Sequence, residues 1–177
     1  MSTKNEVWII NGIPGSGKST TARALAARLG RGAHIEGDAV HDMIISGKVS
    51  PGQAPQEEEN RQIHLCVQNQ CLLARSFCAA GFTPVIDYVV VDRARVEEYR
   101  AHLGGLTLHL VTLNPGVEAA LQRDADRPEK TVAHFWTFLH DLMQERLAGT
   151  GLWVDNRQRT IEETVEMILR NKAQARV

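Results

Sequence analysis

A single motif near the start of the chain limits its possible folds more than any other feature. Residues 12–19 match the phosphate-binding pattern G-x-x-x-x-G-K-[ST] at every fixed position. The apolar residues 7–10 precede the motif and predict a buried strand, and the residues that follow have the apolar spacing of an amphipathic helix. A strand before the loop and a helix after it are the context that a phosphate-binding loop requires.

Each fixed position of the motif has a physical role. Glycines let the backbone turn so that successive amide N–H groups point inward and form a nest for an anion. Lys18 is predicted to reach the β- and γ-phosphates, and Ser19 to place its hydroxyl on Mg²⁺, so ATP and Mg²⁺ are the expected cofactors. A dinucleotide-binding G-x-G-x-x-G motif is disfavoured, because Thr20 stands where the third glycine should be. The residues predicted to bind the nucleotide here are Gly12, Ile13, Pro14, Gly15, Ser16, Gly17, Lys18, Ser19 and Thr20.

Predicted strands and helices alternate along the rest of the chain. Strands are expected at residues 7–10, 33–36, 83–88, 106–113 and 152–154. Helices are expected at residues 20–29, 40–46, 56–80, 92–103, 116–123, 132–147 and 160–171. This alternation predicts an α/β fold with a parallel sheet covered on both faces. With 177 residues and no visible linker or repeat, we expect a single domain over residues 1–177.

Composition and charge exclude several classes of protein. The formal net charge is -1, so no basic excess is present to drive binding to a nucleic-acid polymer. No signal peptide and no run long enough to span a membrane is visible, and we therefore expect a cytoplasmic enzyme. The cysteines Cys66, Cys71 and Cys78 all lie in one predicted helix, with an odd count and no zinc-site spacing, which predicts buried thiols.

Polar residues follow the second and third predicted strands, at the edge where parallel sheets bind ligands. Asp38 is the predicted base that orients and deprotonates an acceptor hydroxyl. Glu36 is an open alternative, because two residues separate it from Asp38 and a strand would point both side chains alike. His41 lies one helical turn after Asp38 and is a candidate ligand of the acceptor. Asp87 ends the third strand and is predicted to bind Mg²⁺ or the acceptor, with a purely structural ion pair as the alternative.

Three arginines are candidates for positive charge at the site, two beside the transferred phosphate and one beside the acceptor. Arg123 and Arg127 lie four residues apart, and we expect them to close over the γ-phosphate and stabilise its negative charge during transfer. Surface ion pairs with neighbouring carboxylates are the alternative for both. Arg61, in the long predicted helix, is a candidate contact to the acceptor, with a solvated helix face as its alternative.

With these residues identified, the sequence resembles the gluconate kinase-like and chloramphenicol phosphotransferase-like group of small P-loop kinases. The wider resemblance is to shikimate and adenylate kinases, and it covers nearly the whole chain. The matching stretches are the loop at residues 12–19, the Gly-Asp-x-x-His element at residues 37–41, the strand ending at Asp87, the arginines Arg123 and Arg127, and residues 154–156 before the last helix. Asp42 stands where gluconate kinases have proline, so the resemblance supports the reaction class better than the substrate.

The resemblance implies a P-loop fold whose five-stranded parallel sheet has the order 2-3-1-4-5, with a small lid over about residues 123–131. It implies that ATP binds between this lid and the loop after the fifth strand, where Asn156 and Arg157 would contact it. It also implies that Asp38 matches the proton-accepting carboxylate of chloramphenicol phosphotransferases.

These observations together predict a kinase that moves the γ-phosphoryl group of ATP to a hydroxyl of a small molecule. A sugar acid, a sugar or a hydroxylated antibiotic would serve as the acceptor. One alternative is a nucleotide or polynucleotide 5′-hydroxyl kinase. Another is an ATP-binding regulatory module without kinase activity, which would have no need of carboxylates such as Asp38 and Asp87. Neither nucleic acid nor membrane is an expected partner.

Overall fold

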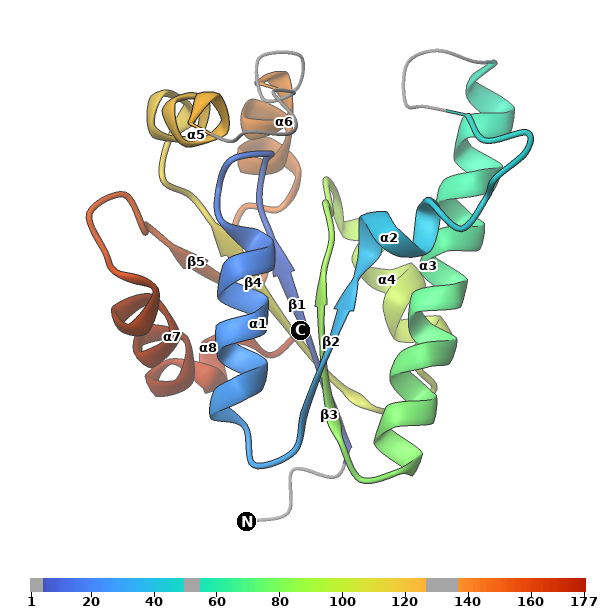
Figure 1. The fold of residues 1–177 in the computed structure, drawn as a ribbon, viewed down its shortest axis with the longest axis horizontal. Coiled ribbons are helices and arrows are strands. Elements are labelled where there is room, and N and C mark those ends of the chain that lie inside the picture. The colour runs from blue at the N-terminus through green and yellow to red at the C-terminus, as the bar shows by residue number, and fades with distance from the viewer. Residues whose placement is uncertain (1–4, 50–54, 127–136) are drawn as a thin grey trace.

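A parallel sheet forms the centre of the molecule (Figure 1). The computed structural model describes residues 5–49, 55–126 and 137–177. In spatial order the five strands are β2 (Gly32–Glu36), β3 (Thr83–Asp87), β1 (Glu6–Asn11), β4 (Thr107–Leu113) and β5 (Leu152–Val154). All neighbouring strands run parallel. The predicted α/β class and the strand order 2-3-1-4-5 are therefore confirmed.

Helices cover both faces of this sheet and stand above its carboxyl edge (Figure 1). Their bounds are α1 (Lys18–Arg28), α2 (Gly37–His41), α3 (Gln56–Ala79), α4 (Arg93–Leu103), α5 (Val117–Ala125), α6 (Phe138–Arg146), α7 (Ile161–Arg170) and α8 (Lys172–Ala175). The central strand β1 shows how the two layers divide. Trp8 and Ile10 pack in one core with residues of α1 and α7, whereas Val7 and Ile9 pack in the other core with α3 and α4. Alternate side chains of one strand thus bury both faces of the sheet.

Most predicted elements agree with the structure to within a few residues, and the segment after β2 is the main difference. The sequence predicted a helix over residues 40–46, but α2 begins earlier, at Gly37, and ends at His41. Strand β2 runs directly into α2, so no loop separates them. A segment this short has too few residues to show a helical period, and its position is set by packing. The short helix α8 was not predicted as a separate element, and residues 132–136 of another predicted helix lie outside the described residues.

The long helix α3 carries the three cysteines as the sequence predicted. Cys66, Cys71 and Cys78 are buried and free of disulfides. Burial raises the pKa of the Cys71 thiol to about 12, which keeps this side chain neutral inside the core. Within the described part of the chain, none of the helices has the length and apolar character needed to cross a membrane.

Asn11, the last residue of β1, ties the carboxyl edge of the sheet together. Its side-chain amide accepts a hydrogen bond from the N–H of Val90 (2.8 Å) and donates to the carbonyl of Val90 (2.9 Å). It also donates to the Thr112 hydroxyl on β4 (3.1 Å). The three bonds are buried, so the chain after β3 is held against the phosphate-binding segment by one side chain.

Replacing this side chain should destabilise the fold measurably. Asn11→Ala leaves the N–H and C=O of Val90 buried without partners, and we expect the free energy of unfolding to fall by about 2–4 kcal/mol. Urea unfolding followed by circular dichroism measures this change. Gln68→Ala, on the exposed side of α3, is the control and should stay within about 0.5 kcal/mol of the unmodified protein. Equal stability of the two variants would contradict the anchoring role of Asn11.

Candidate active site

The phosphate-binding loop has the backbone that its glycines predict. Gly12, Gly15 and Gly17 all have positive φ angles, of 149°, 81° and 92°. At Gly15 the neighbouring backbone also excludes a side chain, because a Cβ there would lie 2.1 Å from the carbonyl oxygen of Ala120. The loop therefore needs glycine for its conformation and for its close approach to α5.

Helix α1 begins at Lys18, directly after the loop, with Gly17 as its N-cap residue. No side chain caps this end and no acidic residue lies in the first turn. The positive end of the helix dipole and the first amide groups are therefore oriented for an anion. The Lys18 ammonium reaches back over the loop and lies 3.3 Å from the carbonyl oxygen of Ile13. This arrangement supplies the nest, the dipole and the cation that a phosphate group requires.

Ser19 and Asp87 meet beside the loop. The Ser19 hydroxyl donates to Oδ2 of Asp87 at 2.5 Å, and His34 Nε2 lies 2.6 Å from Oδ1 of the same carboxylate. Asp87 is only 4% exposed. Among the described residues no cluster of three or more His, Cys, Asp or Glu side chains could hold a metal. A hydroxyl and one carboxylate are hard oxygen ligands that suit Mg²⁺, which in such sites keeps several waters and is held largely by the phosphates.

The carboxylates of Glu36 and Asp38 lie in different elements and have different partners, which the sequence did not anticipate. Glu36 is the last residue of β2, and its carboxylate accepts a hydrogen bond from Arg23 of α1 at 3.1 Å. Asp38 lies in the first turn of α2, so the strand geometry that would have pointed both side chains alike does not apply. Asp38 is exposed, and its carboxylate forms no hydrogen bond or ion pair with another described residue.

Helix α2 rests on a buried polar network. The Cys66 thiol donates to the carbonyl of Gly37 at 3.5 Å, and the amide of Gln70 donates to the Cys66 sulfur at 3.1 Å. Gly37 has no room for a side chain, since a Cβ would lie 2.4 Å from a ring carbon of Tyr88. Burial raises the pKa of Cys66 and of Tyr88, so both side chains stay neutral near Asp38. Within this group of residues, Asp38 is the ionisable side chain that remains exposed.

His41 ends α2 and is 9% exposed, with its Nε2 buried and without a hydrogen-bond partner among the described residues. It lies on the same short helix as Asp38, whereas the helix predicted from the sequence began only at residue 40. Arg61 does not resemble a binding residue in this conformation. It pairs with Glu58 one turn away at 2.9 Å, and its side chain is 78% exposed. The contacts of Arg61 fit its alternative as part of a solvated helix face, and its contact with the acceptor stays a prediction.

The loop after β5 is attached to the phosphate-binding loop. The Asn156 side-chain amide donates to the carbonyl of Ser16 at 2.9 Å. The Arg123 guanidinium, from α5, donates to the carbonyls of Asn156 (2.8 Å) and Arg157 (3.1 Å). Arg123 therefore holds this loop in place, a contact that sequence reasoning missed. Arg127, predicted as its catalytic companion, lies outside the described residues, as does most of the predicted lid over residues 123–131.

Two further site residues were missed at the level of sequence. His34 contacts Asp87, and Asn11 anchors the chain that follows Asp87. The alternation of β2 could have identified His34, because it lies two residues before Glu36 and therefore on the same face of the strand. No sequence signal identifies Asn11 beyond its place at a strand end.

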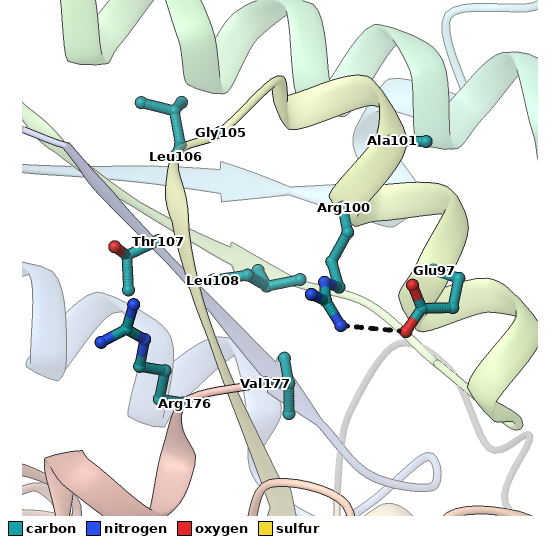
Figure 2. A pocket seen from close by; sticks show the side chains of 9 residues that line it. All are labelled: Glu97, Arg100, Ala101, Gly105, Leu106, Thr107, Leu108, Arg176 and Val177. Atoms are coloured by element: carbon teal, nitrogen blue, oxygen red, sulfur yellow. Dashed lines mark hydrogen bonds and ion pairs between the residues drawn. The ribbon is translucent and has the colours of Figure 1, made fainter.

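A second hollow of the surface lies away from these residues (Figure 2). It is lined by one side of α4, by the start of β4 and by the C-terminal residues Arg176 and Val177. Within it the Arg100 guanidinium pairs with Glu97 at 3.1 Å. Because it adjoins the amino end of β4, it is at the opposite edge of the sheet from the phosphate-binding loop.

Comparison with known proteins agrees with this geometry. The model of the AAA domain family (AAA_33) matches residues 7–149. A gluconokinase from Gluconobacter oxydans (strain 621H) is 31% identical over 136 residues, which make up 76% of this chain and 70% of that protein. Two crystal structures share the fold at lower identity. An unliganded sugar kinase from Janibacter sp. HTCC2649 has a TM-score of 0.74 and 21% identity, covering 97% of this chain and 95% of its own. A gluconokinase from Sinorhizobium meliloti 1021 has a TM-score of 0.72 and 20% identity, covering 98% and 94%.

The loop assignment predicts a specific loss of nucleotide affinity. Lys18→Ala removes the cation above the loop, and we expect ATP to bind about 10-fold or more weakly, since a charge-assisted hydrogen bond contributes about 1.5–3 kcal/mol. Calorimetric titration with ATP and Mg²⁺ measures this affinity. Arg28→Ala removes the same charge from the opposite end of α1 and should leave the affinity unchanged. Unaltered binding in Lys18→Ala would contradict the assignment.

Proposed function

Since this chain belongs to the AAA domain family and is a P-loop kinase of the gluconate kinase-like group, we propose that it transfers the γ-phosphoryl group of ATP to a hydroxyl of a sugar acid or sugar. One observation carries this proposal. The segment with Asp38 and His41 follows β2, and only β3, whose Asp87 is bonded to Ser19, separates it from the phosphate-binding loop. A carboxylate and a histidine thus stand beside the place where phosphates bind.

The spacing of the strands supports this pairing of sites. Neighbouring strands lie about 5 Å apart, so the ends of β2 and β1 are separated by about 10 Å along the carboxyl edge. A terminal phosphate extending from the loop and an acceptor hydroxyl beside α2 fit within that interval. Asp87 lies between the two positions, at the end of β3.

On the nucleotide side, the residues would position the phosphates of ATP and neutralise their negative charge. Amides of residues 12–19 and the ammonium of Lys18 would hold the phosphates against the N-terminus of α1. Ser19, supported by Asp87, would hold Mg²⁺, which when bound neutralises charge on the phosphate oxygens. Asn156 and Arg157, kept in place by Arg123, would contact the nucleotide beside the loop. Arg127 is proposed to approach the γ-phosphate from the lid.

On the acceptor side, Asp38 is the proposed general base. It would accept a hydrogen bond from the acceptor hydroxyl and take its proton as the oxygen attacks phosphorus. Asp38 is preferred over Glu36 because the Glu36 carboxylate is bound to Arg23, whereas that of Asp38 has no such partner among the described residues. His41, with its buried and unpartnered Nε2, is proposed to orient a second polar group of the acceptor.

A sugar acid is the preferred acceptor class because the curated relative is a gluconokinase. The class can be tested directly by offering sugar acids, sugars, nucleosides and hydroxylated antibiotics with ATP and Mg²⁺, and by measuring formation of ADP. We expect turnover with a sugar acid or a sugar. Turnover with nucleosides alone would favour a nucleoside 5′-hydroxyl kinase, and turnover with an antibiotic alone would favour a resistance enzyme. ATP binding without turnover on any acceptor would favour a regulatory module.

The role of Asp38 gives the sharpest prediction. In Asp38→Asn the side chain can still bind the hydroxyl but cannot take its proton, so we expect kcat to fall by about 10²- to 10⁴-fold with ATP affinity unchanged. Steady-state kinetics with the acceptor found in the panel, and ATP titration, measure the two quantities. Asp42→Asn changes a nearby exposed carboxylate that pairs with Lys48 and should have little effect. Phosphoryl transfer at the normal rate in Asp38→Asn would remove Asp38 from the mechanism.

A further inference from the structure

A chain of polar contacts extends from the end of the phosphate-binding loop across β3 and β2 to Arg23 of α1. It begins at the Ser19 hydroxyl, which donates to one oxygen of Asp87, and continues through the other oxygen to Nε2 of His34 at 2.6 Å. His34 Nδ1 in turn lies 3.4 Å from Nε of Arg23. His34 takes no part in the proposed chemistry, yet its side chain is only 16% exposed and is in direct contact with Asp87.

The fold explains why these side chains meet. Strands β2 and β3 pair in parallel with Glu36 opposite Asp87, so His34 and Asp87 come from adjacent strands on the face that α1 covers. Val85, two residues before Asp87, packs in the core beneath α1, whereas Ile35 packs in the core on the other face. Ser19 is on α1 itself. The contacts thus join β2, β3 and α1.

The partners of the imidazole fix the position of its proton. The Nε–H of an arginine can only donate, so His34 Nδ1 must be the acceptor of this bond. The ring proton is then on Nε2, which donates to Asp87 Oδ1. Asp87 therefore receives one hydrogen bond on each oxygen, from Ser19 and from His34.

We infer that His34 is a positioning residue for the magnesium site, acting through Asp87. The inference rests on the proposed function only in assigning Mg²⁺ to Ser19 and Asp87. One bond from Ser19 would leave the carboxylate free to rotate about its Cβ–Cγ bond. A second donor on the other oxygen fixes its plane, and thereby the lone pairs that would be available to Ser19 and to a bound metal. Without His34, Oδ1 of a carboxylate that is 4% exposed would also lose a buried partner.

The test measures metal binding rather than turnover. Mn²⁺ is titrated into the complex of the protein with ADP, and the free ion is followed by its paramagnetic resonance signal. His34→Leu removes the donor at similar size, and we expect Mn²⁺ to bind about 10- to 100-fold more weakly, the range for losing a residue that supports a metal ligand. His34→Gln places an amide donor near the position of Nε2 and should recover most of the affinity. His34→Val should weaken Mn²⁺ binding to the same extent as His34→Leu, because valine also lacks a donor but is favoured in strands.

A double-mutant cycle with Asp87→Asn separates positioning from general stability. If His34 acts through Asp87, His34→Leu should change Mn²⁺ affinity by less than about 2-fold once Asp87 is already replaced. His102→Leu, on α4, is the matched control and should leave Mn²⁺ affinity unchanged. The inference is overturned if His34→Leu and His34→Val bind Mn²⁺ like the unmodified protein. An equal loss in the presence and absence of Asp87 would overturn it as well.

This experiment is independent of the acceptor. If the unmodified protein binds ADP and Mn²⁺ but phosphorylates nothing in the acceptor panel, the proposed kinase activity fails while the role of His34 is still measured. If the acceptor is phosphorylated and His34→Leu binds Mn²⁺ normally, the kinase activity stands and the role of His34 fails.

Discussion

The hydrogen bond from the Ser19 hydroxyl to the Asp87 carboxylate is the contact on which the arrangement of the site depends. It joins the N-terminus of α1 to the end of β3. The phosphate-binding loop alone would be a nest for anions on a strand-to-helix turn. Because this bond ties the loop to β3, the loop is held near the end of β2, which leads into the helix that carries Asp38. Because β3 lies between β1 and β2, Asp87 lies between the phosphate-binding loop and the segment that we propose to bind the acceptor.

The two sides differ in how their geometry is stabilised. On the nucleotide side the backbone itself forms most of the site, because glycines with positive φ shape the loop and the N-terminus of α1 has no side-chain cap. On the proposed acceptor side a short helix carries Asp38 and His41, and the network of Cys66 and Gln70 holds it against α3. Tyr99 completes this network by donating to Gln70. The proposed acceptor residues are therefore positioned by buried side chains of α3 and α4.

Sequence reasoning predicted what local pattern determines. The loop motif, the buried strands and the long helices have periods that can be recognised, and the resemblance to P-loop kinases supplied the strand order, which is confirmed. Sequence reasoning failed where contacts between residues far apart in the sequence determine the structure. The α2 segment is too short to show a period. Arg123 binds carbonyls more than thirty residues away. His34 contacts Asp87 only because β2 pairs with β3. Asp38, His41 and Arg127 stay predictions whose roles rest on chemistry rather than on recorded contacts.

The bond from Asn156 to the Ser16 carbonyl bears on the order of events during folding. It closes a separation of 140 residues, so a segment far away in the sequence contacts the phosphate-binding loop. Contacts of such long range form late, because the intervening polypeptide must first be ordered. During synthesis the phosphate-binding loop is made before β5, so the bond from Asn156 cannot form until β5 has joined β4. A nascent chain would therefore contain the complete motif before the Asn156 contact could form, and a ligand that binds only the completed site would stabilise only the completed fold.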